Sequence, residues 1–450
     1  AYGGKGTYTS QITLNDAGLK GAGKIDYQSG QFWSQEIFFF PDSTRAIADT
    51  MYIAKTEGGV ATPEVHSSNN PISWEPYKDK MHIGMTDQVF AMYEDQTEFT
   101  GDLTLTNVGL TGGGALDWDE ANLASKKIAF TTDALESDTA SLEIKALAGA
   151  GDNVSIRTPN VKAKIDFKER FGNFKANTED IPTEFDYNQY KTAINEFDWD
   201  IDAKVLEFRA PEGSEGSLFE STREDQKGLK FLGKKATYNL VSSKLDVEGV
   251  ERIDVADGYV IPENGEVTID TFAYMHTLEN ARIVMDTLNE FHTITNATVD
   301  IYGRHNLNGS GQIIYKTKGV DDQIIELENI GTVKETVEDK KEEETFRYLT
   351  AEGMILNDQG FQLYQDIDYE GKVKVLSKDE FLEFDGFAKI NYDYPPANAS
   401  ASYFEFNQSF NPADPRIFFE YPKGMGGNTA TAGINLAKRD TSGMYVTLLG

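Results

Sequence analysis

The sequence predicts an all-β protein, in which short strands stack as an elongated repeat array, a β-solenoid or an open β-jellyroll, with few helices. Three observations indicate this fold class. Similar segments recur along the 450 residues. Apolar and polar residues alternate in many short stretches, as in Phe197–Asp202, where apolar side chains would lie on one face of a strand and carboxylates on the other. Turn-forming residues such as Asn15–Gly18 separate these stretches.

The clearest repeat relates Tyr8–Tyr27 to Phe99–Trp118. We expect each copy to fold as strand, turn, strand, with its glycines at a bulge or at a close approach of two backbones. The residues that recur without a gap include Thr13/Thr104, Leu14/Leu105, Gly18/Gly109, Leu19/Leu110, Gly21/Gly112, Gly23/Gly114 and Asp26/Asp117.

Two further similarities extend the repeats toward the C-terminus. A third, shorter copy of the first unit places Leu356–Gly360 against Leu14–Gly18, followed by an Ile-Asp-Tyr triplet at 367–369 that repeats the one at 25–27. A second type of repeat runs from Ala236 to Gly249 and returns from Val373 to Gly386. One building principle therefore covers most of the chain.

We expect five parts along the chain. These are β repeat units at 1–91 and 92–178, a β region at 179–349, a third partial copy at 350–397, and the start of a further β module at 398–450. Exposed loops are expected at 210–228 and 331–344, which are rich in charged or small residues. One or two helical turns are expected in Pro182–Phe197, and a boundary at the proline-containing stretch Tyr394–Ser400.

Composition limits the function classes and the compartment. The formal net charge of -32 disfavours binding to nucleic acid and to anionic lipid headgroups. The absence of cysteine excludes disulfides and thiolate chemistry, and it suits a space outside the cytoplasm. The sequence contains no apolar run of 18 residues, so it predicts no transmembrane helix. The first residues carry no start methionine and no apolar leader, which we interpret as a piece of a longer exported polypeptide.

A family resemblance agrees with these expectations. The run Lys235–Asn239, followed by Leu245–Val250, resembles the repeats of OstA-type proteins, and the likeness extends over about residues 162–392. Those are periplasmic bridge proteins of lipopolysaccharide transport, in which short strands stack as an open β-jellyroll. The chain as a whole also resembles large surface or periplasmic proteins of Bacteroidetes-type bacteria. The resemblance implies the periplasm or cell surface of a Gram-negative bacterium.

The residues with catalytic or metal-binding chemistry do not form a recognisable motif. The five histidines (His66, His82, His276, His292 and His305) lack the spacing of metal ligands. Asp366–Gly371 begins like a calcium loop, but Ser377 stands where a bidentate glutamate is needed. Asp198, Asp200 and Asp202 suit either paired-carboxylate chemistry or, as we prefer, a solvated strand face. We expect no catalytic residue, no cofactor and no metal.

Three functional classes follow, and the first is preferred. It is a non-enzymatic structural or protein-binding scaffold of the cell envelope, with other envelope proteins as partners, for example in an outer-membrane complex. The second is a periplasmic lipid or lipopolysaccharide bridge, and the third a carbohydrate-binding or carbohydrate-cleaving β-solenoid. A scaffold predicts a closed interior filled at repeated positions (Leu14, Leu105 and Leu356, with Tyr27, Trp118 and Tyr369), whereas a lipid bridge needs an open interior.

Overall fold

The protein is almost entirely β-structured, as the sequence predicts. The computed structural model describes residues 1–450 except 17, 148–152, 179–181, 195, 340–341, 392–402, 417, 419–422, 430, 437–443 and 450. Strands account for 63% of the structure and helical segments for 5%. The helical segments described are 3-10 turns: η1 Tyr2–Gly4, η2 Pro76–Lys78, η3 Glu224–Gln226, η4 Glu263–Gly265, η5 Thr271–Ala273 and η6 Asn357–Gln359. No helix among the described residues is long and apolar enough to cross a membrane.

The chain divides into two compact units. Unit 1 comprises 1–222, 233–248 and 268–273, and unit 2 comprises 223–232, 249–267 and 274–450. Unit 1 contains β1 Thr7–Thr9, β2 Ile12–Asn15, β3 Gly18–Tyr27, β4 Gly30–Phe39, β5 Thr44–Ile53, β6 Val65–Glu75, β7 Lys80–Ile83, β8 Phe90–Met92, β9 Thr97–Thr106, β10 Gly109–Trp118, β11 Ala121–Phe130, β12 Ala134–Lys145, β13 Val154–Asp166, β14 Phe171–Ala176, β15 Thr183–Phe185, β16 Tyr190–Thr192, β17 Glu196–Asp200, β18 Val205–Arg209, β19 Ser217–Ser221, β21 Lys235–Asn239 and β22 Lys244–Glu248.

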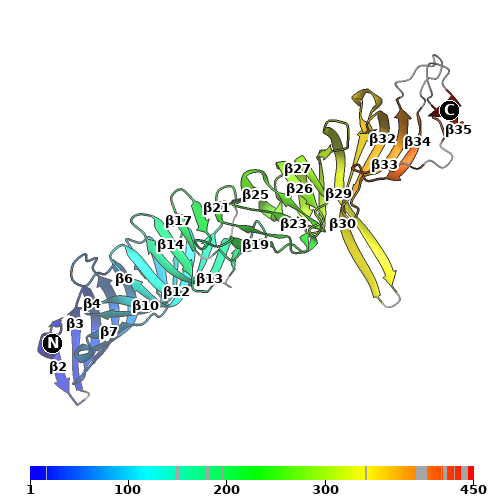
Figure 1. Ribbon diagram of the computed structural model, residues 1–450. Helices are drawn as coiled ribbons and strands as arrows, with labels where there is room; N and C mark the ends of the chain where they lie inside the picture. The colour runs from blue at the N-terminus through cyan, green and yellow to red at the C-terminus, as the bar shows by residue number, and fades with distance from the viewer. Residues whose placement is uncertain are drawn as a thin grey trace. The chain divides into compact units, whose positions relative to one another are not determined.

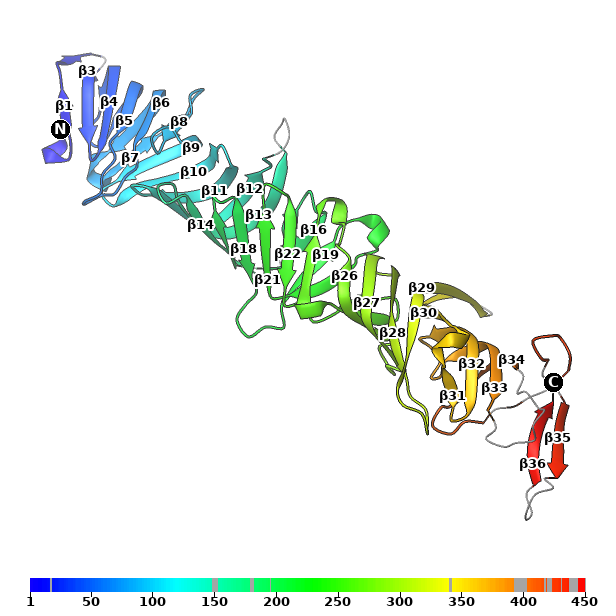
Figure 2. The ribbon, with the colours of Figure 1, turned by 90° about the horizontal axis from the view of Figure 1, so that it is seen from above.

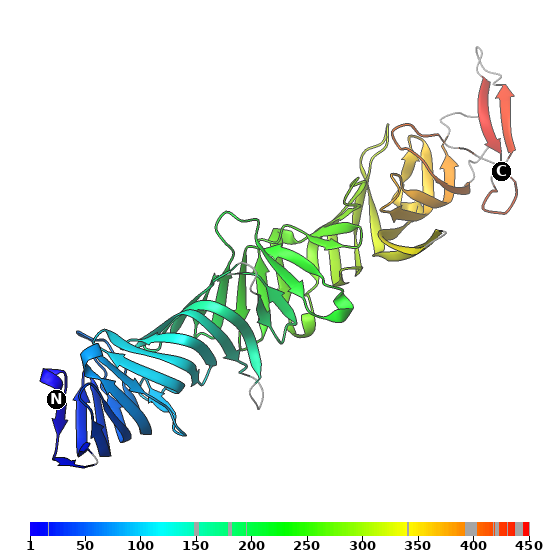
Figure 3. The ribbon, with the colours of Figure 1, turned by 90° about the horizontal axis from the view of Figure 1, so that it is seen from below.

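In the first part of unit 1, most paired strands are antiparallel and follow one another along the chain; later the pairing skips strands, as where β14 pairs with β17 and β18 with β21. β3 pairs with β4, β4 with β5, and β5 with β6; β9 to β14 repeat this arrangement. Figure 1 labels several of these strands, Figure 2 labels all of them, and Figure 3 shows the chain from the side opposite to Figure 2. Because side chains alternate across each strand, every second residue enters the interior.

The first repeat is confirmed in the backbone. β2 and β3 form the expected strand, turn and strand, and β9 and β10 form the second copy. The glycines mark a bulge in both copies, because the register with the next strand shifts between Gly21 and Gly23 and again between Gly112 and Gly114. At Gly114 a Cβ atom would lie 2.1 Å from the carbonyl oxygen of Thr100, so the close backbone approach requires glycine there.

Large aromatic side chains fill the interior of unit 1. Trp74 and Trp199 are fully buried, and the Trp118 ring lies 6.3 Å from the Trp199 ring. Phe185 and Tyr238 also meet, with ring centroids 5.1 Å apart. Burial of such side chains contributes roughly 1.5–3 kcal/mol each, so these layers stabilise the array. The core therefore lies between the strand layers of the unit.

The expected interior positions are confirmed in four of six cases. Leu105, Tyr27, Trp118 and Tyr369 are buried. Leu14 and Leu356 are exposed, and for them the prediction is wrong. Leu14 lies on β2, whose pairing in the described part of the chain is with β3 alone. Leu356 precedes the turn η6, outside any strand. Sequence position in a repeat therefore predicts burial poorly for a residue on a strand with one described partner, such as Leu14, or outside any strand, such as Leu356.

Unit 2 uses the same antiparallel pairing, and its β29 and β30 are the longest strands described. β26 pairs with β27, β27 with β28, β28 with β29, and β32 with β33. Its strands are β23 Ile253–Val255, β24 Gly258–Ile261, β26 Leu278–Met285, β27 His292–Gly303, β28 Asn306–Tyr315, β29 Gln323–Asp339, β30 Glu342–Ile355, β31 Gln362–Tyr364, β32 Ile367–Leu376, β33 Glu383–Ile390, β34 Phe404–Ser409, β35 Thr431–Leu436 and β36 Met444–Leu449; β20 Lys230–Gly233 and β25 Glu266–Ile269 lie at the unit boundaries.

The second repeat type also has equivalent elements. One copy forms β21 and β22, and the other forms β32 and β33. Four apolar positions of the repeat are buried in both copies. These pairs are Ala236/Val373, Tyr238/Val375, Leu245/Leu382 and Val247/Phe384. The alternation of apolar and polar residues therefore predicts the inward face correctly in both places.

Several local expectations are wrong. Pro182–Phe197 contains no helical turn in its described residues; it forms β15, β16 and the start of β17, and its three- and four-residue spacing comes from tight turns between short strands. The segment 210–228 is not a continuous loop, because β19 crosses it and buries Phe219. The segment 331–344 belongs mostly to β29 and β30, a hairpin stabilised by backbone pairing. The expected boundary at Tyr394–Ser400 lies outside the described residues.

Candidate functional site

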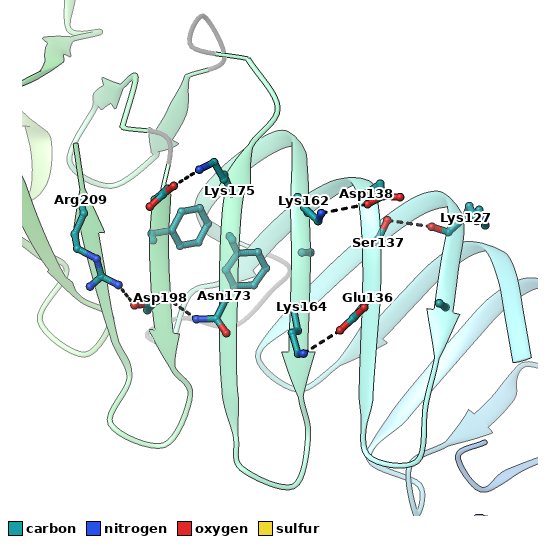
Figure 4. Close-up of a pocket in the computed structure, with 15 residues that line it drawn as sticks. Lys127, Glu136, Ser137, Asp138, Lys162, Lys164, Asn173, Lys175, Asp198 and Arg209 are labelled. Carbon is teal, nitrogen blue, oxygen red and sulfur yellow. Dashed lines mark hydrogen bonds and ion pairs between the residues drawn. The ribbon is translucent and has the colours of Figure 1, made fainter. Parts of the chain in front are cut away.

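A groove of about 660 Å³ lies on the outer face of unit 1 (Figure 4). Six strands contribute to it: β11, β12, β13, β14, β17 and β18. Its polar lining consists of Lys127, Glu136, Ser137, Asp138, Lys162, Lys164, Asn173, Lys175, Glu196, Asp198 and Arg209. We call this surface the charged groove.

Strand pairing places the charges of the groove in cross-strand pairs. Lys164 Nζ lies 2.9 Å from Glu136 Oε1, and Lys162 Nζ lies 3.6 Å from Asp138 Oδ1. On the other side Lys175 pairs with Glu196. These contacts link neighbouring strands, as the dashed lines in Figure 4 show. Each exposed pair contributes only about 0–1 kcal/mol to folding, so the ladder shapes the surface more than it stabilises the fold.

Asp198 is the most constrained carboxylate of the groove. It pairs with Arg209 on β18 and accepts a hydrogen bond of 2.6 Å from the Asn173 amide on β14. Cross-strand register explains both contacts. On β14, Asp198 lies directly opposite Asn173. On β18 it lies opposite Glu207, and Arg209 is the next residue along β18 on the same face. The carboxylate is thus held by strands on both sides.

Two lysines face each other across neighbouring strands. Lys162 on β13 lies directly opposite Lys175 on β14. Like charges in this position repel, and here the flanking carboxylates Asp138 and Glu196 offset the repulsion. Lys127 makes no ion pair within the part of the chain that the structure describes. With five cations and four carboxylates, the groove lacks the strong acidity of the whole chain, whose net charge is -32.

Beneath the groove, on the inner face of the same strands, the packing is apolar. The rings of Phe174 and Phe197 stack with centroids 4.7 Å apart, and Ala163 lies beside them on β13. All three side chains are buried. At the other side of the groove the register between β12 and β13 shifts between Ser137 and Ala140. A bulge of this kind increases local twist and re-aims side chains.

The groove offers fixed charges and few uncharged hydrogen-bonding groups. The hydrogen bond to Glu136 raises the pKa of Lys164, which keeps this ammonium group charged. The lining contains no histidine, and its single hydroxyl, on Ser137, hydrogen-bonds Ser125 and the Lys127 carbonyl. Such a surface can hold a polar partner by charge and hydrogen bonds.

The three aspartates of the predicted strand face have separate partners. Asp198 lies in the charged groove, whereas Asp200 accepts a 2.8 Å hydrogen bond from the Ala203 amide in the following turn. Asp202 pairs with Arg170 at 3.0 Å. The structure therefore does not bring the three carboxylates together.

The other candidates from the sequence also remain apart. In the Asp366–Gly371 segment, Asp366 lies in a turn, Asp368 contacts Gln362, and Glu370 contacts Asn357. Within the described ranges, no group of three or more His, Asp or Glu side chains could hold a metal ion.

The histidines have different environments. His66 pairs with Asp95 at 2.9 Å, and His82 contacts the Thr104 hydroxyl at 3.2 Å. His292 is buried, with Nε2 2.7 Å from the carbonyl oxygen of Asp379. Burial lowers the pKa of both His82 and His292. These contacts are structural, because they join neighbouring strands and loops.

Unit 2 carries a second groove, of about 510 Å³, that the sequence reasoning missed. It is mostly apolar and lies beside β27 and β28 and the turn before β33. Phe291 and Ile314 are partly exposed in it, while Tyr315, Phe384 and Phe410 form its buried wall. The adjacent apolar pairs Ile313–Ile314 and Phe381–Leu382 interrupt strict alternation and were the available signal.

Comparison with known proteins gives no relative of this chain: no family model, no curated protein and no solved structure matches it.

Proposed function

We propose that this chain is a non-enzymatic scaffold that binds another protein in the envelope of a Gram-negative bacterium, as part of a larger exported protein. The observation that carries the proposal is the charged groove. Its ammonium and carboxylate groups are positioned by strand register over a packed apolar layer, so little ordering is needed when a partner binds. Complementary charges then select the partner and align it.

The groove also suggests the kind of partner surface. The facing lysines, Lys162 and Lys175, suit an acidic side chain placed between them. Lys127 offers a further cationic contact on the same face, whereas the outer carboxylates suit basic groups. Outside the groove the chain has more carboxylates than cationic groups, and this negative charge repels an acidic partner there. The groove therefore suits a protein of mixed charge.

The filled interior of unit 1 supports a scaffold over a lipid carrier. Trp74, Trp199 and Tyr190 are fully buried there, together with many aliphatic side chains. An interior that carries acyl chains needs accessible apolar surface, whereas these side chains already contact one another. Rigid packing suits a part that positions other molecules.

Site-specific crosslinking in the native bacterium tests the proposal. A photoreactive residue at position 173 would lie in the groove, and Lys162→Glu with Lys175→Glu would reverse the charge of its centre. We expect a defined protein crosslink that is lost in the reversed variant. The matched control, Lys227→Glu with Lys318→Glu, changes two exposed lysines of unit 2 and should keep the crosslink. A crosslink that persists after charge reversal would contradict the proposal.

The apolar groove of unit 2 favours a second candidate, the lipid or lipopolysaccharide bridge. Its partly exposed Phe291 and Ile314 could contact an acyl chain, with Lys316 near a phosphate or carboxylate headgroup. Extraction of the purified protein and mass spectrometry of the extract distinguish the two candidates. Copurified lipid that decreases in Ile314→Asp would favour the bridge over the scaffold.

A further inference from the structure

The charged groove is part of a longer row of charges on the outer face of unit 1. Residues that lie opposite each other on neighbouring strands share one face of the sheet. Strand register and one ion pair place seven exposed charged residues in this row, one on each of seven neighbouring strands: Asp138, Lys162, Lys175, Glu196, Arg209, Lys235 and Glu248. We call it the charge row. Figure 4 labels four of its members, in the order Asp138, Lys162, Lys175 and Arg209 across the strands.

The signs of the charges follow a regular order along the charge row. Two cations stand between each carboxylate and the next, so that the order is acid, cation, cation, acid, cation, cation, acid. The first cation pair is Lys162 and Lys175, and the second is Arg209 and Lys235; in both pairs the two residues lie directly opposite each other. The midpoints of the pairs are three strand spacings apart, which corresponds to about 14 Å.

The stability of the sheet does not account for this order. Like charges directly opposite each other on neighbouring strands are destabilising, whereas strict alternation of sign would give every cation a carboxylate on either side. Arg209 pairs with Asp198, outside the charge row, and Lys235 makes no ion pair with any residue that the structure describes. In the whole chain 74 acidic residues face 42 basic ones, yet the charge row has four cations and three carboxylates. The cation pairs are therefore available to a partner.

We propose that the charge row binds a protein segment that presents two acidic groups about 14 Å apart, one to each cation pair. This partner chemistry rests on the proposed function, because the charged groove contains the first cation pair and part of the second. Each acidic group would lie between two cations. In an extended segment two residues that are four positions apart are separated by about 14 Å, since a strand rises about 3.4 Å per residue. Binding of the first group holds the second near its own cation pair, so the two contacts reinforce each other.

The carboxylates of the charge row select against other anionic partners. Glu196 lies between the two cation pairs and repels a polymer that carries a negative charge on every unit. Acidic side chains separated by neutral residues avoid this repulsion. A second copy of the chain carries a net charge of -32 and is repelled as a whole. These observations favour a segment of another protein.

Peptide binding tests the proposal. The two-pair probe is a fluorescent peptide of sequence Glu-Glu-Gly-Ser-Glu-Glu, and the one-pair probe is Glu-Glu-Gly-Ser-Gln-Gln. We expect the two-pair probe to bind the full chain at least about fivefold more tightly, as measured by fluorescence anisotropy at low ionic strength. This gain should disappear in Lys235→Glu and decrease in Lys235→Gln, which adds no negative charge beside Glu248. Lys204→Glu is the matched control, because Lys204 is exposed in the turn between β17 and β18, outside the charge row.

The outcomes separate this proposal from the proposed function. Equal affinities of the two probes for the parent chain would overturn it, and so would a gain that persists in Lys235→Glu with an unchanged circular dichroism spectrum. Tighter binding of polygalacturonate than of the two-pair probe, at equal charge concentration, would assign the charge row to an acidic polysaccharide and also overturn it. The proposed function stands in these cases if the crosslink at position 173 is still lost on reversal of Lys162 and Lys175. Absence of that crosslink in the parent chain would contradict both.

Discussion

The rings of Phe174 and Phe197 stack in the interior of unit 1, with centroids 4.7 Å apart and planes inclined by 13°. They are opposite each other on β14 and β17, one position away from the Lys175 and Glu196 pair on the outer face. The same two strands therefore bury the aromatic pair on one side and hold the ion pair on the other. Packing in the core fixes the spacing of the charged groove.

The first prediction concerns this aromatic pair. Phe197→Ala should lower the free energy of unfolding by about 3–5 kcal/mol, because it removes a buried ring and leaves a cavity beside Phe174. Phe171→Ala is the control on the neighbouring strand, since Phe171 is 37% exposed and should cost much less. Urea unfolding followed by fluorescence measures both. Similar losses in the two variants would contradict the role assigned to the stack.

The second prediction compares two leucines that occupy the same repeat position. Leu105→Ala should cost about 2–5 kcal/mol, since Leu105 is fully buried opposite Met81. Leu14→Ala should change the unfolding free energy by no more than about 0.5 kcal/mol, because Leu14 is 76% exposed. Chemical unfolding of both variants under one set of conditions gives the comparison. A large cost at Leu14 would mean that β2 is covered in solution.

These two leucines also show how far the sequence predicts the fold. Alternation fixes which side of a strand faces inward, so the buried positions of β10 and β22 follow from the pattern alone. Alternation carries no information about what lies beyond the strand. Leu14 and Leu105 are identical in the repeat and differ only in their neighbours, which are set by tertiary structure.

The candidate site was less predictable for a related reason. The carboxylates of β17 stand out in the sequence, whereas the lysines that complete the groove lie on strands distant along the chain, as with Lys127 and Lys175. Only the register between strands brings them together. The charged segment 331–344 predicts an exposed loop but lies mostly in a long hairpin of β29 and β30. Backbone pairing in such a hairpin tolerates a polar sequence, so side-chain composition alone does not identify it.

The third prediction concerns the three aspartates. Replacing Asp198, Asp200 and Asp202 together by Asn should lower stability by no more than about 1–3 kcal/mol in total, because exposed ion pairs contribute about 0–1 kcal/mol each. The fold should persist, as circular dichroism would show. A polysaccharide-directed activity of the parent chain that is lost in this folded variant would contradict the non-enzymatic proposal.

The fourth prediction concerns the bulge of the repeat. Gly114→Ala should destabilise unit 1 strongly, by more than about 2 kcal/mol, because the new Cβ would lie 2.1 Å from the Thr100 carbonyl oxygen. Gly58→Ala is the matched control, since a Cβ there meets no atom within 4 Å. Thermal unfolding of the two variants measures the difference. Equal midpoints would show that the bulge relaxes without cost.

The last prediction concerns the pH dependence contributed by His292. Burial lowers its pKa below the ordinary value of 6.5, and the hydrogen bond with the Asp379 carbonyl offsets this only in part. Between the folded and unfolded pKa values the unfolded chain binds more protons than the folded chain. The stability that neutral His292 provides is therefore complete above about pH 7 and falls as pH drops through 6.5 toward the folded pKa.

His292→Gln keeps an N–H donor for the Asp379 carbonyl but does not titrate, so the stability advantage of the parent chain over this variant should shrink between pH 7 and pH 5. His82 and His305, whose pKa values burial also lowers, are present in both proteins and cancel in the difference. Urea unfolding at a series of pH values measures that difference. Parallel curves for the parent chain and His292→Gln would mean that His292 is protonated equally in both states.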